Sequence, residues 1–168
     1  MKAVVSIIMG STSDLKVMEK AAAFLNELEI PFEINALSAH RTPGEVEVFA
    51  KNAERNGIKV IIAGAGMAAH LPGVIASMTT VPVIGVPINA TLDGMDALLA
   101  IVQMPPGIPV ATVGINGALN AGILAVQMMA TGDAKMMEKI HEHKKTLKQK
   151  IVKANEDLKA VDYKFKVN

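Results

Sequence analysis

The chain has 168 residues, of which 51% are hydrophobic and 20% are charged, and its formal net charge is +1. This length is enough for one domain with a core, and the hydrophobic content excludes a disordered chain. A charge so close to zero gives no general reason to expect nucleic acid or another acidic partner. The sequence contains no cysteine, which excludes disulfides and thiolate chemistry and is typical of a cytoplasmic protein.

Apolar segments that suit β-strands alternate along the chain with segments of helical period. Leu15, Met18, Ala22 and Leu25 share one face of the first expected helix. Several of the strand segments are apolar at almost every position, as in a parallel sheet that helices cover on both faces. This alternation predicts an α/β fold: a three-layer α/β/α sandwich with a doubly wound parallel sheet of the flavodoxin or Rossmann type. The expected strands are residues 3–9, 31–37, 59–64, 81–87 and 109–115, and the expected helices are residues 15–28, 43–55, 71–79, 92–103 and 117–130.

No charged residue occurs from Ala97 to Thr131. A membrane-spanning helix needs about 20 continuous apolar residues. Three prolines and an Asn-Gly turn interrupt the stretch, so we expect a buried strand and a helix instead of a membrane span. The helix expected at 117–130 has almost no polar face, which predicts that a second subunit covers it.

The last part of the chain differs in composition from the rest. Residues 133–168 contain ten lysines and six acidic residues, a charge of +4 against −3 for residues 1–132. Leu147, Ile151 and Leu158 form an apolar stripe of helical period. We expect residues 1–132 to form a single catalytic α/β domain, and residues 133–168 to form a helical arm that packs on this domain or on a neighbouring subunit. A nucleic-acid-binding arm is disfavoured, because the segment has no arginine and no interleaved aromatic residues.

Ligands of open parallel sheets bind beyond the carboxyl ends of the strands, so the loops that follow the first three strands are the candidate site. The first, GSTSD at 10–14, opens a helix, and its N–H groups and hydroxyls suit a phosphate. A capping role for Ser13 or Asp14 is the alternative. The carboxylate of Asp14 suits sugar hydroxyls better than a phosphate, since like charges repel.

The second and third loops, SAHRTP at 38–43 and AGAGMAAHLPG at 63–73, contain His40, Arg41 and His70. An arginine there can grip a phosphate with two parallel hydrogen bonds. A histidine beside it can transfer protons near neutral pH. The alternatives are a packing role for the histidines and a surface ion pair for Arg41.

The sequence gives little support for a cofactor or a metal. The segment GAGMAA at 64–69 formally matches a dinucleotide-binding pattern, but it follows the third strand and lacks the acidic residue expected about 20 positions later. His141 and His143 are two residues apart on an expected helix, so they point to different sides. We therefore expect no cofactor and no metal site.

Four segments together, MGSTSD, SAHRTP, AGAGMAAHLPG and IVQMPPGIPVATV, resemble the N5-carboxyaminoimidazole ribonucleotide mutases of the PurE class I family, from about residue 3 to residue 130. The resemblance implies an isomerase of purine (IMP) biosynthesis. It would move a carboxylate from the exocyclic nitrogen of its substrate to carbon 4 of the imidazole, which gives 4-carboxy-5-aminoimidazole ribonucleotide. It further implies a cytoplasmic homo-octamer that uses no metal, ATP or organic cofactor.

The resemblance also implies roles for particular residues, with His40 as the general acid and base. Met67 stands where the family usually has a glycine, and a methionine would be strained there if the backbone needed a positive φ. The other implied site residues are Ser11, Ser13, Asp14, Ser38 and Arg41 around the substrate's phosphate and ribose, and Ala65, Gly66, His70 and Leu71 around the base and the migrating carbon dioxide.

Two alternatives of different kinds remain at this point. One is a direct aminoimidazole ribonucleotide carboxylase, a related class that keeps the SAH segment but differs in the third loop. The segment AAHLPG favours the mutases over that class. The other is a non-catalytic module that binds a nucleotide or flavin mononucleotide on the same sheet.

Overall fold

The computed structural model describes residues 1–168 and contains one sheet of five parallel strands. The strand order is β2-β1-β3-β4-β5, so the chain first builds outward on one side of β1 and then crosses to build on the other side. This order confirms the predicted α/β fold with a doubly wound, flavodoxin-like sheet. The strands are β1 (Val5–Met9), β2 (Phe32–Ala36), β3 (Val60–Gly66), β4 (Val83–Ile88) and β5 (Ala111–Thr112).

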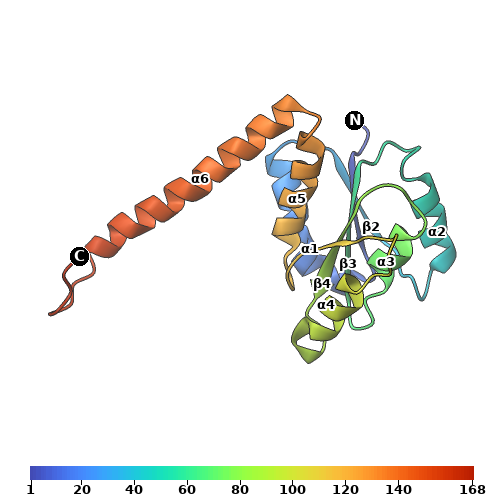
Figure 1. The fold of residues 1–168 in the computed structure, drawn as a ribbon, viewed down its shortest axis with the longest axis horizontal. Coiled ribbons are helices and arrows are strands. Elements are labelled where there is room, and N and C mark those ends of the chain that lie inside the picture. The colour runs from blue at the N-terminus through green and yellow to red at the C-terminus, as the bar shows by residue number, and fades with distance from the viewer.

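Helices cover both faces of the sheet, as the three-layer prediction requires (Figure 1). A cluster of 18 buried residues fills the space between the sheet and two helices, α1 (Leu15–Glu27) and α5 (Ala118–Ala130). A second cluster of 15 buried residues lies on the opposite face, under the other three helices. These are α2 (Pro43–Asn52), α3 (Leu71–Ala76) and α4 (Met95–Val102).

The central strands have unbroken apolar sequences because each of their faces packs against a helical layer. Ile7 on β1 and Ile62 on β3 belong to the cluster under α1 and α5. Their neighbours Ile8 and Ile61 belong to the cluster on the other face. All four are fully buried. Successive side chains of a strand point to opposite faces of the sheet. Because both faces are buried here, every position of these strands can be apolar.

The last strand differs most from its prediction. Residues 109–115 were expected to be extended, but β5 contains only Ala111 and Thr112, paired with Ile84 and Gly85 of β4. This strand is at the edge of the sheet and has a single neighbour. Pro109 has no N–H with which to begin the ladder.

Several other element boundaries also differ from the prediction by a few residues. The helix expected at 71–79 ends at Ala76, and the helix expected at 92–103 is preceded by a short 3₁₀ turn, η2 (Leu92–Gly94), in which Gly94 has φ of +81°. β3 extends to Gly66, two residues beyond its expected end. Ala65 and Gly66 are therefore held by ladder hydrogen bonds to β4, which gives this part of the third loop a fixed position.

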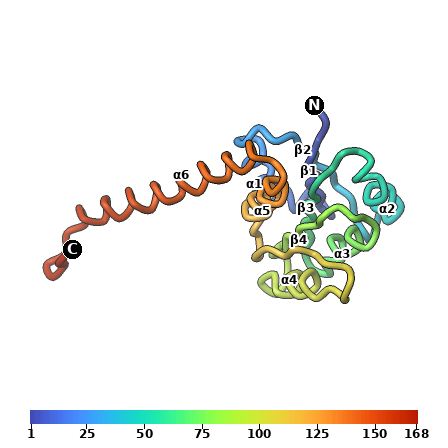
Figure 2. Tube along the Cα trace, turned by 45° about the horizontal axis from the view of Figure 1, so that its top comes forward, coloured from blue at the N-terminus to red at the C-terminus, as the bar shows by residue number.

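The C-terminal arm is a single long helix, α6 (Ala134–Lys159), which leaves the domain after its first turns and projects outward (Figures 1 and 2). The Asp133 carboxylate caps it by accepting hydrogen bonds from the N–H groups of Lys135 and Met136, at 2.9 and 3.1 Å. Ile140 is the only buried residue of α6. The division of the chain at residue 132 stays a prediction.

The apolar stripe of α6 is not covered by the rest of the chain. Leu147 is 46% exposed, Ile151 72% and Leu158 59%. The expectation that the arm packs on its own domain is therefore wrong for its distal half, and packing on a neighbouring subunit is the alternative that remains. None of the helices combines the length and the apolar character that crossing a bilayer requires.

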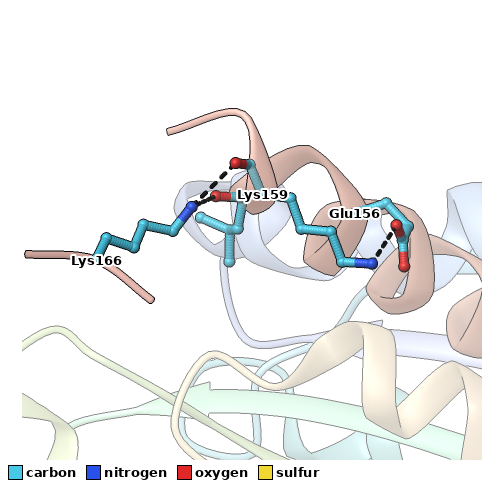
Figure 3. Close-up of polar contacts among 4 residues, drawn as sticks. Glu156, Lys159 and Lys166 are labelled. Atoms are coloured by element: carbon cyan, nitrogen blue, oxygen red, sulfur yellow. Dashed lines mark hydrogen bonds and ion pairs between the residues drawn. The ribbon is translucent and has the colours of Figure 1, made fainter. Parts of the chain in front are cut away.

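The end of α6 is closed by a lysine from the segment that follows it (Figure 3). The Lys166 ammonium donates hydrogen bonds to the carbonyl groups of Leu158, Lys159 and Val161, at 2.8, 3.0 and 2.8 Å. Leu158 and Lys159 are the last two residues of α6, and a positive charge beside their carbonyls complements the negative end of the helix dipole. The terminal segment is thus folded back onto the arm.

Candidate active site

The three predicted loops meet around one cavity of about 460 Å³ at the carboxyl ends of β1, β2 and β3. This is the point at which the strand order reverses, where doubly wound sheets bind their ligands. Ala90, from the segment after β4, completes the wall. The lining residues are Gly10, Ser11, Ser13, Asp14, Ser38, Ala39, His40, Arg41, Ala65, Gly66, Met67, Ala68, Leu71 and Ala90.

The first loop forms a short 3₁₀ turn, η1 (Thr12–Asp14), before α1 begins. Ser11 caps this turn: its hydroxyl accepts a hydrogen bond from the N–H of Ser13 at 3.3 Å. Asp14 precedes the first residue of α1 but makes no capping hydrogen bond. The alternative in which Ser13 or Asp14 acts as the helix cap is therefore wrong, and the carboxylate of Asp14 remains available to a ligand.

The Asp14 carboxylate is held in a partly desolvated position. Burial raises the pKa of Asp14 above its ordinary value, while hydrogen bonds from the Ser13 hydroxyl and the Ser11 backbone and the positive charge of Arg41 oppose the rise. The Ser13 hydroxyl lies 3.3 Å from Asp14 Oδ1. An ionised carboxylate with so little hydration gains from additional donors, such as the hydroxyls of a sugar.

Arg41 connects the first loop to the second. Its Nη2 donates to the carbonyl of Gly10 at 2.5 Å, and its Nε and backbone N–H donate to the Ser38 hydroxyl at 3.3 and 3.2 Å. The Ser38 backbone is fixed in turn by Thr42, whose hydroxyl accepts from the Ser38 N–H at 2.9 Å. None of the four ion pairs in the chain includes Arg41, so the ion-pair alternative is wrong. Its charge is left to act on an anion in the cavity.

The two predicted histidines are in contact. His40 Nε2 and His70 Nδ1 lie 2.9 Å apart, with the rings nearly perpendicular at 85°. One nitrogen must carry the hydrogen and the other the lone pair, so the tautomers of the two rings are linked. When His40 donates from Nε2, its Nδ1, which has no protein partner, is the atom that can exchange a proton with a ligand.

His70 itself is not part of the cavity wall. It stands beside His40, while Ala65, Gly66 and Leu71 line the cavity. Five residues of the wall were not among the predicted site residues: Gly10, Ala39, Met67, Ala68 and Ala90. The same rule applied to the fourth strand would have found Ala90, since it follows β4.

Met67 has a φ of +54°, in the left-handed region. This conformation costs a side-chain-bearing residue about 1–2 kcal/mol relative to glycine. The sequence predicted strain at Met67 if its φ were positive, and this strain is present.

No group of three or more histidine, aspartate or glutamate side chains is placed to hold a metal ion. Independence from metals and cofactors stays a prediction.

A doubly wound sheet with a polar cavity at the point of strand reversal defines a small-molecule-binding protein of the α/β class. The chain matches the AIR carboxylase family over residues 4–150, and it belongs to this family.

Individual relatives span nearly the whole chain. The N5-carboxyaminoimidazole ribonucleotide mutase of Thermotoga maritima is 52% identical, with 98% of this chain and 96% of that protein covered. The phosphoribosylaminoimidazole carboxylase of Candida glabrata is 50% identical over 96% of this chain, which corresponds to only 29% of the yeast protein. The crystal structure of Treponema denticola PurE superposes with a TM-score of 0.84 at 29% identity, covering 92% of this chain and 98% of that one.

Replacing Asp14 by asparagine tests whether this carboxylate serves a ligand. The change preserves shape but removes the charge that strengthens hydrogen bonds from hydroxyl donors. We expect kcat/KM on the nucleotide substrate to fall at least tenfold, or about 1.4 kcal/mol. An unchanged kcat/KM in Asp14→Asn would remove Asp14 from the site.

The same variant has a predictable stability. Because burial raises the pKa of Asp14 in the folded state, the stabilisation by its protonated form is present in acid and is lost as pH rises through that pKa. At neutral pH Asp14→Asn should therefore melt at or slightly above the wild-type temperature. Thermal melts should show this advantage disappearing below the ordinary pKa of an aspartic acid.

Proposed function

We propose that the chain is an N5-carboxyaminoimidazole ribonucleotide mutase, an isomerase of purine biosynthesis. The observation that carries this proposal is the 52% identity to a mutase over almost the full length of both chains. The cavity adds support, because the motif residues line it, with His70 directly behind His40. The reaction moves the carboxylate of a carbamate from nitrogen to carbon 4 of the imidazole ring.

The substrate's phosphate is proposed to bind between the first two loops. Ser11, Ser13 and Ser38 provide hydroxyls there, and Arg41 provides a positive charge that forms no ion pair with another residue of the chain. Asp14 lies on the same side and accepts hydrogen bonds from the ribose hydroxyls. In this arrangement the Asp14 carboxylate binds the neutral ribose hydroxyls, and the Arg41 guanidinium binds the phosphate anion.

His40 is proposed to act as both acid and base. As an imidazolium it protonates the carbamate nitrogen, and the bond between nitrogen and the carboxylate carbon breaks, with its electron pair left on nitrogen. The ring then attacks the released carbon dioxide through carbon 4, using its own electron pair. His40, now neutral, removes the proton from carbon 4 and is again an imidazolium. The hydrogen bond with His70 fixes the orientation of the ring during both transfers.

Carbon dioxide has to stay beside the ring between these steps. The wall opposite the polar loops is apolar and closely built: Ala65 is 7% exposed and Leu71 is 3% exposed. Such a surface offers carbon dioxide no hydrogen bonds and limits the water that could divert it. Holding two reacting partners at contact distance accounts for a large share of catalysis in such reactions.

The experiment for this proposal compares wild type with His40→Asn. The wild-type enzyme should convert the carbamate substrate to the carbon-4 carboxylate in bicarbonate-free buffer without ATP or metal. His40→Asn should retain less than about a tenth of this rate with a nearly unchanged melting temperature, because an exposed amide replaces an exposed imidazole but cannot cycle a proton. Turnover is measured by the absorbance of the product.

Other outcomes would favour the alternatives. Activity that requires bicarbonate and starts from aminoimidazole ribonucleotide would identify a direct carboxylase. A flavin spectrum in the purified protein without turnover would indicate a binding module. A variant that keeps more than a tenth of the rate would show that His40 is not the sole acid and base.

The assembly is proposed to be a cytoplasmic homo-octamer. Support comes from apolar surface that one chain leaves uncovered, including Leu119 on α5 at 44% exposure and Ile151 on α6 at 72%. A projecting helix with an apolar stripe gains most when another subunit buries it.

Removing residues 147–168 tests the role of the arm in assembly. This truncation keeps Ile140 and the first turns of α6, so the core of each chain is preserved. Light scattering should show a smaller particle than the wild-type assembly. Ile151→Ser should weaken assembly in the same direction, whereas Lys153→Ser, two residues away and on the opposite side of the helix, should not. A truncated chain of unchanged particle size would show that the arm does not hold subunits together.

A further inference from the structure

Met67 is the one cavity residue whose backbone adopts a conformation unfavourable for its side chain. Its φ is +54°, and no other residue of the cavity wall that bears a side chain has a positive φ. It lines the cavity and yet is 57% exposed, which places it at the mouth. Strain kept at a binding site is a reason to look for a role of the strained residue.

The surrounding backbone does not let Met67 relax. On one side, Gly66 is paired with Ile88 in the sheet and packs so closely that an added Cβ would lie 3.1 Å from the Cβ of Ala90. On the other side, the Ala69 N–H donates to the Met67 carbonyl and the His70 N–H donates to the Ala68 carbonyl, both at 2.8 Å. The positive φ is therefore required by the turn that carries the chain from β3 to α3.

The side chain of Met67 differs from its apolar neighbours in reach. The other apolar residues around the mouth are small: Ala39, Ala68 and Ala90 each end at Cβ. Methionine is long, unbranched and flexible, so it can cover an opening and still move aside. A glycine at this position would remove the strain but would leave the mouth open on its apolar side.

We propose that Met67 is a retention residue that covers the apolar side of the cavity and slows the escape of carbon dioxide during the reaction. This inference rests on the proposed mutase function. After His40 protonates the carbamate nitrogen and the nitrogen–carbon bond breaks, the products in the cavity are aminoimidazole ribonucleotide and carbon dioxide. Either carbon 4 recaptures the carbon dioxide, or it escapes past the mouth and the ribonucleotide is released. Met67 favours recapture.

The partition between these two outcomes is the measurement. Wild type, Met67→Ala, Met67→Gly and Met67→Leu are given the carbamate substrate in buffer continuously purged of carbon dioxide. Aminoimidazole ribonucleotide and the carbon-4 carboxylate are quantified together, after subtraction of the uncatalysed loss. Met67→Ala and Met67→Gly should raise the fraction released as aminoimidazole ribonucleotide at least threefold. Met67→Leu keeps an apolar side chain of similar size and should stay within twofold of wild type.

A matched control separates retention from the relief of strain. Glu29 also has a positive φ, of 55°, and lies at the end of α1 away from the cavity. Glu29→Gly should remove backbone strain without changing the partition. A role confined to the backbone would place Met67→Ala, which keeps the strain, at the wild-type partition, and this result would overturn the inference.

The same experiment distinguishes failure of this inference from failure of the proposed function. If wild type forms no carbon-4 carboxylate at all, both are overturned. If wild type turns over and Met67→Ala partitions as wild type does, only the role of Met67 is overturned. Circular dichroism melts of each variant confirm that the compared proteins are folded.

Discussion

The site depends on the Arg41 guanidinium, which fastens the loop after β2 to the loop after β1. Its hydrogen bond to the Gly10 carbonyl joins the two loops, and its hydrogen bond to the Ser38 hydroxyl holds the guanidinium within its own loop. With these loops fixed, the serine hydroxyls and Asp14 line one wall of the cavity. A cation that bonds to neutral groups keeps its charge for a ligand, so the same side chain can organise the site and attract an anion.

The third loop holds its residues in fixed positions even though the backbone of Met67 is strained. β3 continues to Gly66, and the tight turn that follows sets the position of Met67 and of His70. His70 then meets His40 from the second loop at 2.9 Å. The serines, Asp14, His40 and Arg41 thus follow β1 and β2, whereas Ala65, Gly66 and Leu71 come from β3 and α3.

The sequence predicted the sheet, its doubly wound order and the three loops well, because strand polarity and loop composition are local properties that an alternating pattern displays. The sequence-based prediction was wrong where a feature depends on how an element packs against the rest of the fold. The length of β5 is set by its edge position and Pro109, and the exposure of Ile151 is set by how far α6 extends beyond the domain. Ser11 was not recognised as the cap of the first turn, since GSTSD offers several equivalent candidates. The contact between His40 and His70 needed the fold, because 30 residues separate them.

In the proposed reaction, the carboxylate carbon released from nitrogen is the one that becomes bonded to carbon 4. The direct measurement uses carbamate substrate labelled with carbon-13 at the carboxylate, in buffer that contains unlabelled bicarbonate. Mass spectrometry of the product should show that most of the label is retained at early times, because the cavity holds the carbon dioxide until the ring captures it. A product that carries the isotope ratio of the bicarbonate pool would contradict the account, since the carbon would then have entered from solution.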